Sequence, residues 1–227
     1  MKRIFKITVF LFVVFSCCFI QNSRNNASAA TVNVTVTIFS TKNNNHSWLM
    51  IKNNSSSTIK VGHYSLSKND TVTIGTWGNI SQHKGIWYNY EAYIGSDRFS
   101  NHVSISRNIT TSDQLNAFNN AINKGDSWSM LNTCAYFAGY VWDQTFSTKV
   151  NVGIAPSLLA ESIIEIGGYV TNRVMPSKSV SNIYYHTSTG IKACSNPTGG
   201  GSSSGSKMIN DVTSFPIEQL ETLNGGQ

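Results

Sequence analysis

The chain is poor in charge and in cysteine. Only 12% of its 227 residues are charged, and residues 1–30 hold four of the 17 basic residues and none of the 11 acidic ones. Without those residues the net charge falls from +6 to about +2, and no run of Lys or Arg remains. A basic face of the kind that binds nucleic acid is therefore not expected, and no nucleic-acid partner is predicted.

The motifs of common metal sites are also missing. The sequence contains neither HExxH nor CxxC, and its five histidines form no close cluster with aspartates. We therefore predict no metal and no other cofactor. Of the four cysteines, Cys17 and Cys18 lie within the first twenty residues, which leaves only Cys134 and Cys194 in the rest of the chain.

Residues 1–30 have the features of an export signal. Lys2, Arg3 and Lys6 precede an apolar run over residues 7–20, and the small residues 27–30 supply a cleavage site. The run is short for a membrane span. We predict a secreted protein with no stable membrane insertion once this signal peptide is removed. Lipidation at Cys17 is the alternative, because residues 14–17 loosely resemble a lipobox.

Two hydrophobic periods divide the rest of the chain. An alternating pattern predicts strands at residues 31–40, 47–52, 58–66, 71–77, 87–94 and 103–109. Helical spacing then predicts three helices: one between Thr111 and Gly125, one from about Cys134 to residues 142–145, and one from Pro156 to Gly167. A last strand is predicted near residues 183–186. An antiparallel β meander followed by helices indicates the α+β class.

The domain boundaries follow from composition. Residues 196–207 are rich in Gly and Ser and predict a flexible linker, and residues 208–227 form a C-terminal tail. The signal peptide ends at residue 30, so a single domain is predicted over residues 31–195, a length that can bury one core. We expect a monomer.

Cys134 lies where a polar loop leads into the second predicted helix. Asn132 or Thr133 can cap that helix, and the unpaired N–H groups of a first turn favour a thiolate, the nucleophilic form of cysteine. Two other interpretations stay open. The helical spacing of Cys134 with Phe137 fits a small buried core residue, and a disulfide with Cys194 fits an oxidising compartment.

A cysteine nucleophile needs a base and a group that orients the base. His46 opens the apolar strand predicted at residues 47–52, a rigid position for an imidazole. A histidine that opens a strand, a meander, and then a cysteine that opens a helix resemble the circularly permuted NlpC/P60, papain-like thiol hydrolases, in which the histidine precedes the cysteine. The resemblance covers roughly residues 32–170, with residues 129–142 as the nucleophile helix.

The resemblance implies a role for each of these residues. Cys134 would be the nucleophile, its backbone N–H would help to stabilise the oxyanion, and His46 would be the base. The family places a polar orienting group on a strand beside the histidine. If residues 53–57 close a hairpin, His63 or Tyr64 faces His46, so His63 is the first candidate. Glu91 is the second, as a carboxylate just after an aromatic strand.

The function implied by the resemblance is that of a secreted cysteine hydrolase. Such an amidase or peptidase would cleave amide bonds by a Cys–His mechanism, with peptide or cell-wall peptidoglycan as its substrate. Two alternatives stay open: a lipid acyl hydrolase or acyltransferase on the same fold, and a non-catalytic secreted binding module with a Cys134–Cys194 disulfide. A cluster of aromatic side chains fits the wall of a substrate groove, but ordinary core packing is the favoured interpretation. Its members are Trp77, Trp87, Tyr88 and Tyr90.

Overall fold

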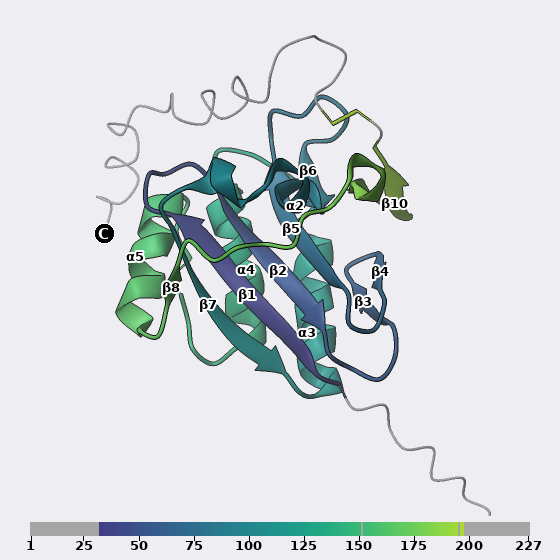
Figure 1. The fold of residues 1–227 in the computed structure, drawn as a ribbon, viewed down its shortest axis with the longest axis horizontal. Coiled ribbons are helices and arrows are strands. Elements are labelled where there is room, and N and C mark those ends of the chain that lie inside the picture. Colours follow the sequence, from purple (N-terminus) through teal and green to yellow (C-terminus); the bar gives the residue numbers. More distant parts are fainter. Residues whose placement is uncertain (1–31, 151, 195, 198–227) are drawn as a thin grey trace, which may run out of the picture. The chain divides into compact units, whose positions relative to one another are not determined.

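The computed structural model describes residues 32–150, 152–194 and 196–197, which form a mixed α+β fold around a large antiparallel sheet (Figure 1). The predicted α+β class is therefore confirmed. The order of the eight strands is β10-β9-β6-β5-β2-β1-β7-β8. Their bounds are β1 (Val34–Thr41), β2 (Ser47–Asn53), β5 (Thr71–Trp77), β6 (Gly85–Tyr88), β7 (His102–Ile109), β8 (Val170–Thr171), β9 (Tyr184–Thr187) and β10 (Gly190–Ala193).

Three helices lie together on one face of this sheet (Figure 1). They are α3 (Ser112–Lys124), α4 (Cys134–Thr145) and α5 (Pro156–Ile166), all close to their predicted bounds. The side chain of Thr111 accepts a hydrogen bond from the backbone N–H of Gln114, as the capping pattern predicts. Helix α4 packs on β1, β2 and β5, which brings its first residue to the sheet.

The central strands separate two apolar cores, because alternate side chains of a strand point to opposite faces. Ile38 and Leu49 belong to the core under the helices, whereas Phe39 and Trp48 belong to a second core. The indole N–H of Trp48 donates to the sulfur of Met175 at 3.0 Å. In Figure 1 the segment that follows β8 crosses the sheet on the face opposite the helices.

Two predicted strands are corrected by the structure. Residues 58–66 form a small separate hairpin of β3 (Ile59–Val61) and β4 (Tyr64–Leu66), because Gly62 turns the chain with a φ of 56°. Residues 87–94 are not one strand either. Asn89 adopts a left-handed φ of 62°, which ends β6 and starts the short helix α2 (Tyr90–Ile94).

Short helical turns complete the described fold, namely η1 (Ser96–Phe99) and η2 (Val180–Asn182). No helix in the described part of the chain is long and apolar enough to cross a membrane. The predicted signal peptide over residues 1–30, most of the linker over residues 196–207, and the tail over residues 208–227 lie outside the described residues.

Candidate active site

The turn between β1 and β2 places His46. The hydroxyl oxygen of Thr41 accepts hydrogen bonds from the backbone N–H groups of Asn45 at 2.8 Å and His46 at 2.9 Å. Asn44 takes a left-handed φ of 59°, a conformation that asparagine tolerates better than most residues. Because the backbone N–H of His46 is hydrogen-bonded within this turn, the position from which its ring reaches the site is held fixed.

Cys134 is the first residue of α4. Thr133 caps this helix by accepting the backbone N–H of Tyr136 at 3.2 Å, and the Thr133 hydroxyl donates to the carbonyl of Ile154 at 2.7 Å. The Cys134 side chain is buried, and the His46 ring and the backbone N–H groups of Ser47 and Ala135 lie close enough to act on the charge of its sulfur. A thiolate at this position therefore has several donors and the positive end of a helix dipole.

Glu91 supplies the carboxyl group beside His46. Its Oε1 lies 3.1 Å from His46 Nε2 and accepts the indole N–H of Trp77 at 2.8 Å. The Glu91 side chain is fully buried, and its Oε2 has no hydrogen-bond partner among the described residues. Since Nε2 is occupied by Glu91, Nδ1 is the ring nitrogen left for the thiol. The imidazole of His46 therefore lies between the carboxyl group of Glu91 and the sulfur of Cys134.

The pKa shifts of the thiol and the imidazole both favour an ion pair between the two groups. Burial acts to lower the pKa of His46, but the charge of Cys134 and hydrogen bonds to Cys134 and Glu91 outweigh it and raise the pKa to about 9. Burial acts to raise the pKa of Cys134, but His46 and the two backbone N–H groups lower it below its usual range. Each partner therefore favours the charged form of the other, which is what a thiolate nucleophile requires.

Aromatic rings enclose the imidazole. The His46 ring centroid lies 4.1 Å from that of Trp77, 5.6 Å from Phe99 and 5.8 Å from Trp48. Trp77, Trp87 and Tyr90 are themselves buried in the second core. Their role as core packing is therefore confirmed, and the structure adds that one of them, Trp77, contacts the site directly.

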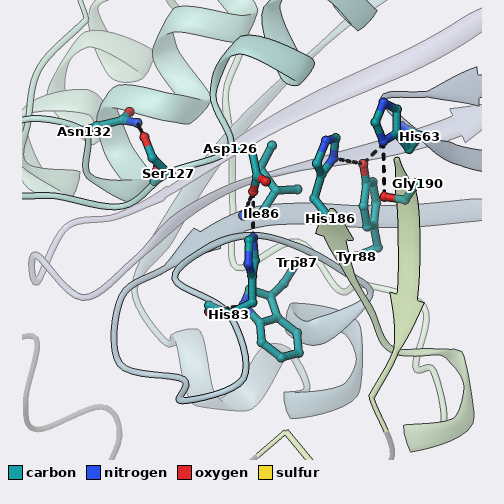
Figure 2. Close-up of polar contacts among 10 residues, drawn as sticks. All are labelled: His63, His83, Ile86, Trp87, Tyr88, Asp126, Ser127, Asn132, His186 and Gly190. Carbon is teal, nitrogen blue, oxygen red and sulfur yellow. Dashed lines mark hydrogen bonds and ion pairs between the residues drawn. The ribbon is translucent and has the colours of Figure 1, made fainter. Parts of the chain in front are cut away.

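His63 does not take the orienting position. The expected hairpin across residues 53–57 is absent, since β2 pairs with β1 and β5 while β3 pairs with β4. The His63 ring instead stacks on His186 with centroids 4.2 Å apart, and its Nδ1 lies 3.2 Å from the carbonyl of Gly190. Figure 2 shows this group together with Tyr88, whose hydroxyl is hydrogen-bonded to His186 Nδ1 at 3.1 Å.

Glu91, the second candidate, is the residue that the structure brings to His46. The sequence carried one signal for it: Glu91 is the only acidic residue between Asp70 and Asp97, in the middle of an aromatic run. A lone carboxylate among residues that form a core needs a buried partner. Asn89, which breaks the predicted strand, is the feature that turns Glu91 inward on α2.

A second pair of histidine and carboxylate lies between the β5–β6 connection and the loop before α4 (Figure 2). His83 Nε2 is 2.7 Å from Asp126 Oδ1, which also accepts the backbone N–H of Ile86 at 2.9 Å. These contacts tie the loop that leads to Cys134 to the start of β6. Sequence reasoning did not find this pair, because 43 residues separate its members.

Both cysteines of the described domain are free. Cys194 is buried in the second core and donates its backbone N–H to the carbonyl of Ile183 at 3.0 Å. The Cys134–Cys194 disulfide of the binding-module alternative is therefore not formed. Within the described residues, no group of three or more His, Cys, Asp or Glu side chains is arranged to hold a metal ion.

Comparisons of this chain with protein-family models, with curated proteins and with solved structures found no match.

Proposed function

We propose that the protein is a secreted cysteine hydrolase that cleaves amide bonds with Cys134, His46 and Glu91. The observation that carries the proposal is the position of the His46 ring, which contacts the Glu91 carboxyl group at 3.1 Å and interacts with the charge of the nearby Cys134 thiol. The directions of the two pKa shifts support a nucleophilic thiolate. A histidine that precedes the cysteine in the chain also supports assignment to the permuted papain-like hydrolases.

The first half of the reaction forms a thioester. The Cys134 thiolate attacks the carbonyl carbon of the amide, and the electron pair of the C=O bond moves to oxygen. The C–N bond then breaks as the His46 imidazolium gives its proton to the departing amine. The products are an acyl group on sulfur, a neutral imidazole and a free amine.

The second half restores the thiolate. Neutral His46 takes a proton from water, and the resulting hydroxide attacks the thioester carbonyl. The C–S bond breaks and releases a carboxylic acid, so the net reaction is addition of one water across the amide. Cys134 is the first residue of α4, so its backbone N–H has no acceptor within the helix and is available to the oxyanion.

Glu91 acts as a positioning residue in this proposal. Its Oε1 accepts Nε2–H of His46, which keeps the ring in the tautomer and orientation that present Nδ1 to the thiol. The same carboxyl group stabilises the imidazolium form. His63 has no place in this mechanism.

Cell-wall peptide is the substrate that we propose, by analogy with the exported thiol hydrolases that this chain resembles. A second candidate is a lipid ester. It is favoured by Met130 and Leu131, two residues that are 57% and 64% exposed on the loop just before Cys134. Apolar side chains at that place suit an acyl chain as well as an apolar peptide.

The two free cysteines provide a matched test. Cys134 and Cys194 are both 6% exposed, so Cys134→Ala and Cys194→Ala remove the same atoms from equally buried positions. Peptidoglycan peptide fragments and phospholipid vesicles are incubated with each variant, and released amines and fatty acids are quantified by mass spectrometry. We expect Cys134→Ala to lose about a thousandfold or more of the activity and Cys194→Ala to stay within about threefold of wild type.

The two substrates distinguish the two candidate functions. New amino groups from the peptide fragments support the amidase, and fatty acid release from vesicles supports the lipid alternative instead. Turnover by Cys134→Ala equal to that of the wild type would overturn the cysteine mechanism for either substrate.

A further inference from the structure

Two residues of β5 lie under the contact between His46 and Glu91. Gly75 and Trp77 are two positions apart, so they occupy the same face of the strand. β5 pairs with β2 on one side and with β6 on the other, which makes it an interior strand that cannot easily shift. Both residues meet the Glu91 carboxyl group, in two different ways.

Gly75 leaves the space in which the pair meets. A Cβ atom built on Gly75 would overlap Glu91 Oε1, and it would lie 3.1 Å from His46 Nε2 and 3.3 Å from the Glu91 carboxyl carbon. The φ of Gly75 is not in the left-handed region, so its backbone would accept alanine. Space beside the His46 and Glu91 side chains, and not backbone conformation, is therefore what requires glycine here.

Trp77 holds the carboxyl group in that space. Its indole N–H donates to the same Oε1 that contacts His46, and its ring lies 4.1 Å from the imidazole. Because Oε2 has no partner among the described residues, Oε1 takes both of the hydrogen bonds that the carboxyl group makes there. Without the indole N–H, the bond from His46 would be the one contact left to orient the carboxyl group among the described residues.

We infer that Gly75 and Trp77 are positioning residues of the site, which together set the place of the Glu91 carboxyl and through it the orientation of His46. This inference rests on the proposed function, since it assumes that the His46–Cys134 pair is the reacting pair. Gly75 acts by the absence of a side chain, and Trp77 acts by one N–H bond.

Two substitutions test the inference, each with a matched control. Gly75→Ala adds the methyl group that meets the carboxyl, and Gly190→Ala adds the same group to a strand glycine with open space around it. Trp77→Phe removes the N–H bond to Glu91. Trp87→Phe removes an indole bond in the same core that goes to the carbonyl of His83 at 3.1 Å instead of to the Glu91 carboxyl.

The readout is the rate at which iodoacetamide alkylates Cys134 between pH 5 and pH 9, followed by mass spectrometry on the full chain. Displacing the Glu91 carboxyl makes the protonated form of His46 less stable, so a smaller fraction of Cys134 is thiolate at acid pH. The pH profile of alkylation then moves to higher pH. At pH 6 we expect Gly75→Ala to react about tenfold more slowly than wild type and Trp77→Phe about threefold. Both controls should follow the wild-type profile.

The outcomes separate this inference from the proposed function. A wild-type profile with no reactivity below the ordinary thiol range would overturn the thiolate on which the proposed function depends. A reactive wild type with unshifted Trp77→Phe would overturn the positioning role alone. Circular dichroism identifies a variant that does not fold, and because Trp77→Phe keeps an aromatic ring in the core, it still gives a decisive result if Gly75→Ala is unfolded.

Discussion

Two pairs of histidine and carboxylate in this molecule are built alike. His46 meets Glu91 at 3.1 Å beside Gly75, and His83 meets Asp126 at 2.7 Å beside Gly85. A Cβ on Gly85 would lie 2.5 Å from Asp126 Oδ1 and 2.6 Å from His83 Nε2, so this glycine too leaves room for its pair. The contact between imidazole and carboxylate is therefore a repeated feature and cannot by itself mark an active site.

What differs is the surroundings of each pair. The side chains of the His46–Glu91 pair are 4% and 0% exposed, against 20% for each member of the His83–Asp126 pair. The first pair continues to the Cys134 thiol, whereas the second ends on the backbone N–H of Ile86. Burial strengthens each charge interaction, and in the first pair the imidazole can exchange a proton with the thiol. The comparison supports the proposed chemistry for the first pair and loop attachment for the second.

The neighbouring histidines show the same contrast. Burial lowers the pKa of His186, Asp126 opposes this shift, and the nearby His63 and His83 lower it further. In the site, the pKa of His46 is raised to about 9 because Cys134 and Glu91 favour the imidazolium. The pKa of His186, which lies among other histidines, is lowered toward the neutral form, whereas the pKa of His46, which lies between a thiol and a carboxyl group, is raised toward the charged form.

Replacing the histidine of each pair with asparagine is expected to give the largest difference in the rate of substrate cleavage. His46→Asn removes the group that protonates the leaving amine, and we expect the rate of substrate cleavage to fall about a thousandfold. His83→Asn should stay within about threefold of wild type, because His83 contacts neither the thiol nor His46 among the described residues. The assay is kcat/KM on the substrate that the wild type cleaves. Equal losses in the two variants would contradict the assignment of one pair to catalysis.

Replacing each carboxylate with its amide is expected to give a smaller difference in kcat. Glu91→Gln keeps the shape but removes the charge that favours the imidazolium, and we expect kcat to fall about 10- to 100-fold with little change in KM. Asp126→Asn should keep kcat within about threefold but lower the free energy of unfolding by about 1–2 kcal/mol, through weaker bonds to His83 and Ile86. Steady-state kinetics and urea denaturation measure both quantities.

His63→Gln is the control for the orienting role. The structure places His63 against His186 and Gly190, so this variant should keep wild-type kcat. A loss in His63→Gln as large as that in Glu91→Gln would return the orienting role to His63.

The last expected effect is on stability and not on the rate of reaction. The pKa of His46 is raised from 6.5 to about 9, so its stabilising contribution is full below pH 6.5 and is lost as the pH rises through 9. The difference in unfolding free energy between wild type and His46→Asn should therefore be larger at pH 6 than at pH 10, by up to about 3 kcal/mol. Urea denaturation at the two pH values measures it.

The same measurement in a Cys134→Ala background provides the control. Cys134 is the largest of the contributions that raise the pKa of His46, so the pH dependence should shrink when the thiol is removed. An unchanged pH dependence would show that the thiol and the imidazole are not coupled.

Much of the fold was predictable because its signals are local. Strand β5 matches the predicted residues 71–77, and α5 begins at Pro156 and ends before Gly167 as proline and glycine signals predict. The capped start of α4 placed Cys134 correctly at the beginning of a helix. Each of these features depends on residues within a few positions of one another.

The partner of His46 was not predictable in the same way. Two residues were candidates, and the choice of His63 depended on a hairpin that the chain does not form. Single conformational choices decided it: the turn at Gly62 folds residues 58–66 onto themselves, and Asn89 turns Glu91 into a helix. A one-residue change of register or a left-handed residue moves a side chain to the other face, and the alternating pattern does not reveal it.

The sequence by itself determined where the three long helices and several of the strands begin, and which cysteine stands at a helix start. Caps, turns and alternation act over a few residues, so local composition is enough to set them. Only the tertiary structure decided that the Glu91 carboxyl, and not His63, meets His46, because strand order and the missing side chain at Gly75 bring together residues that are 45 positions apart. That contact depends on packing of the whole sheet, and no short stretch of the chain encodes it.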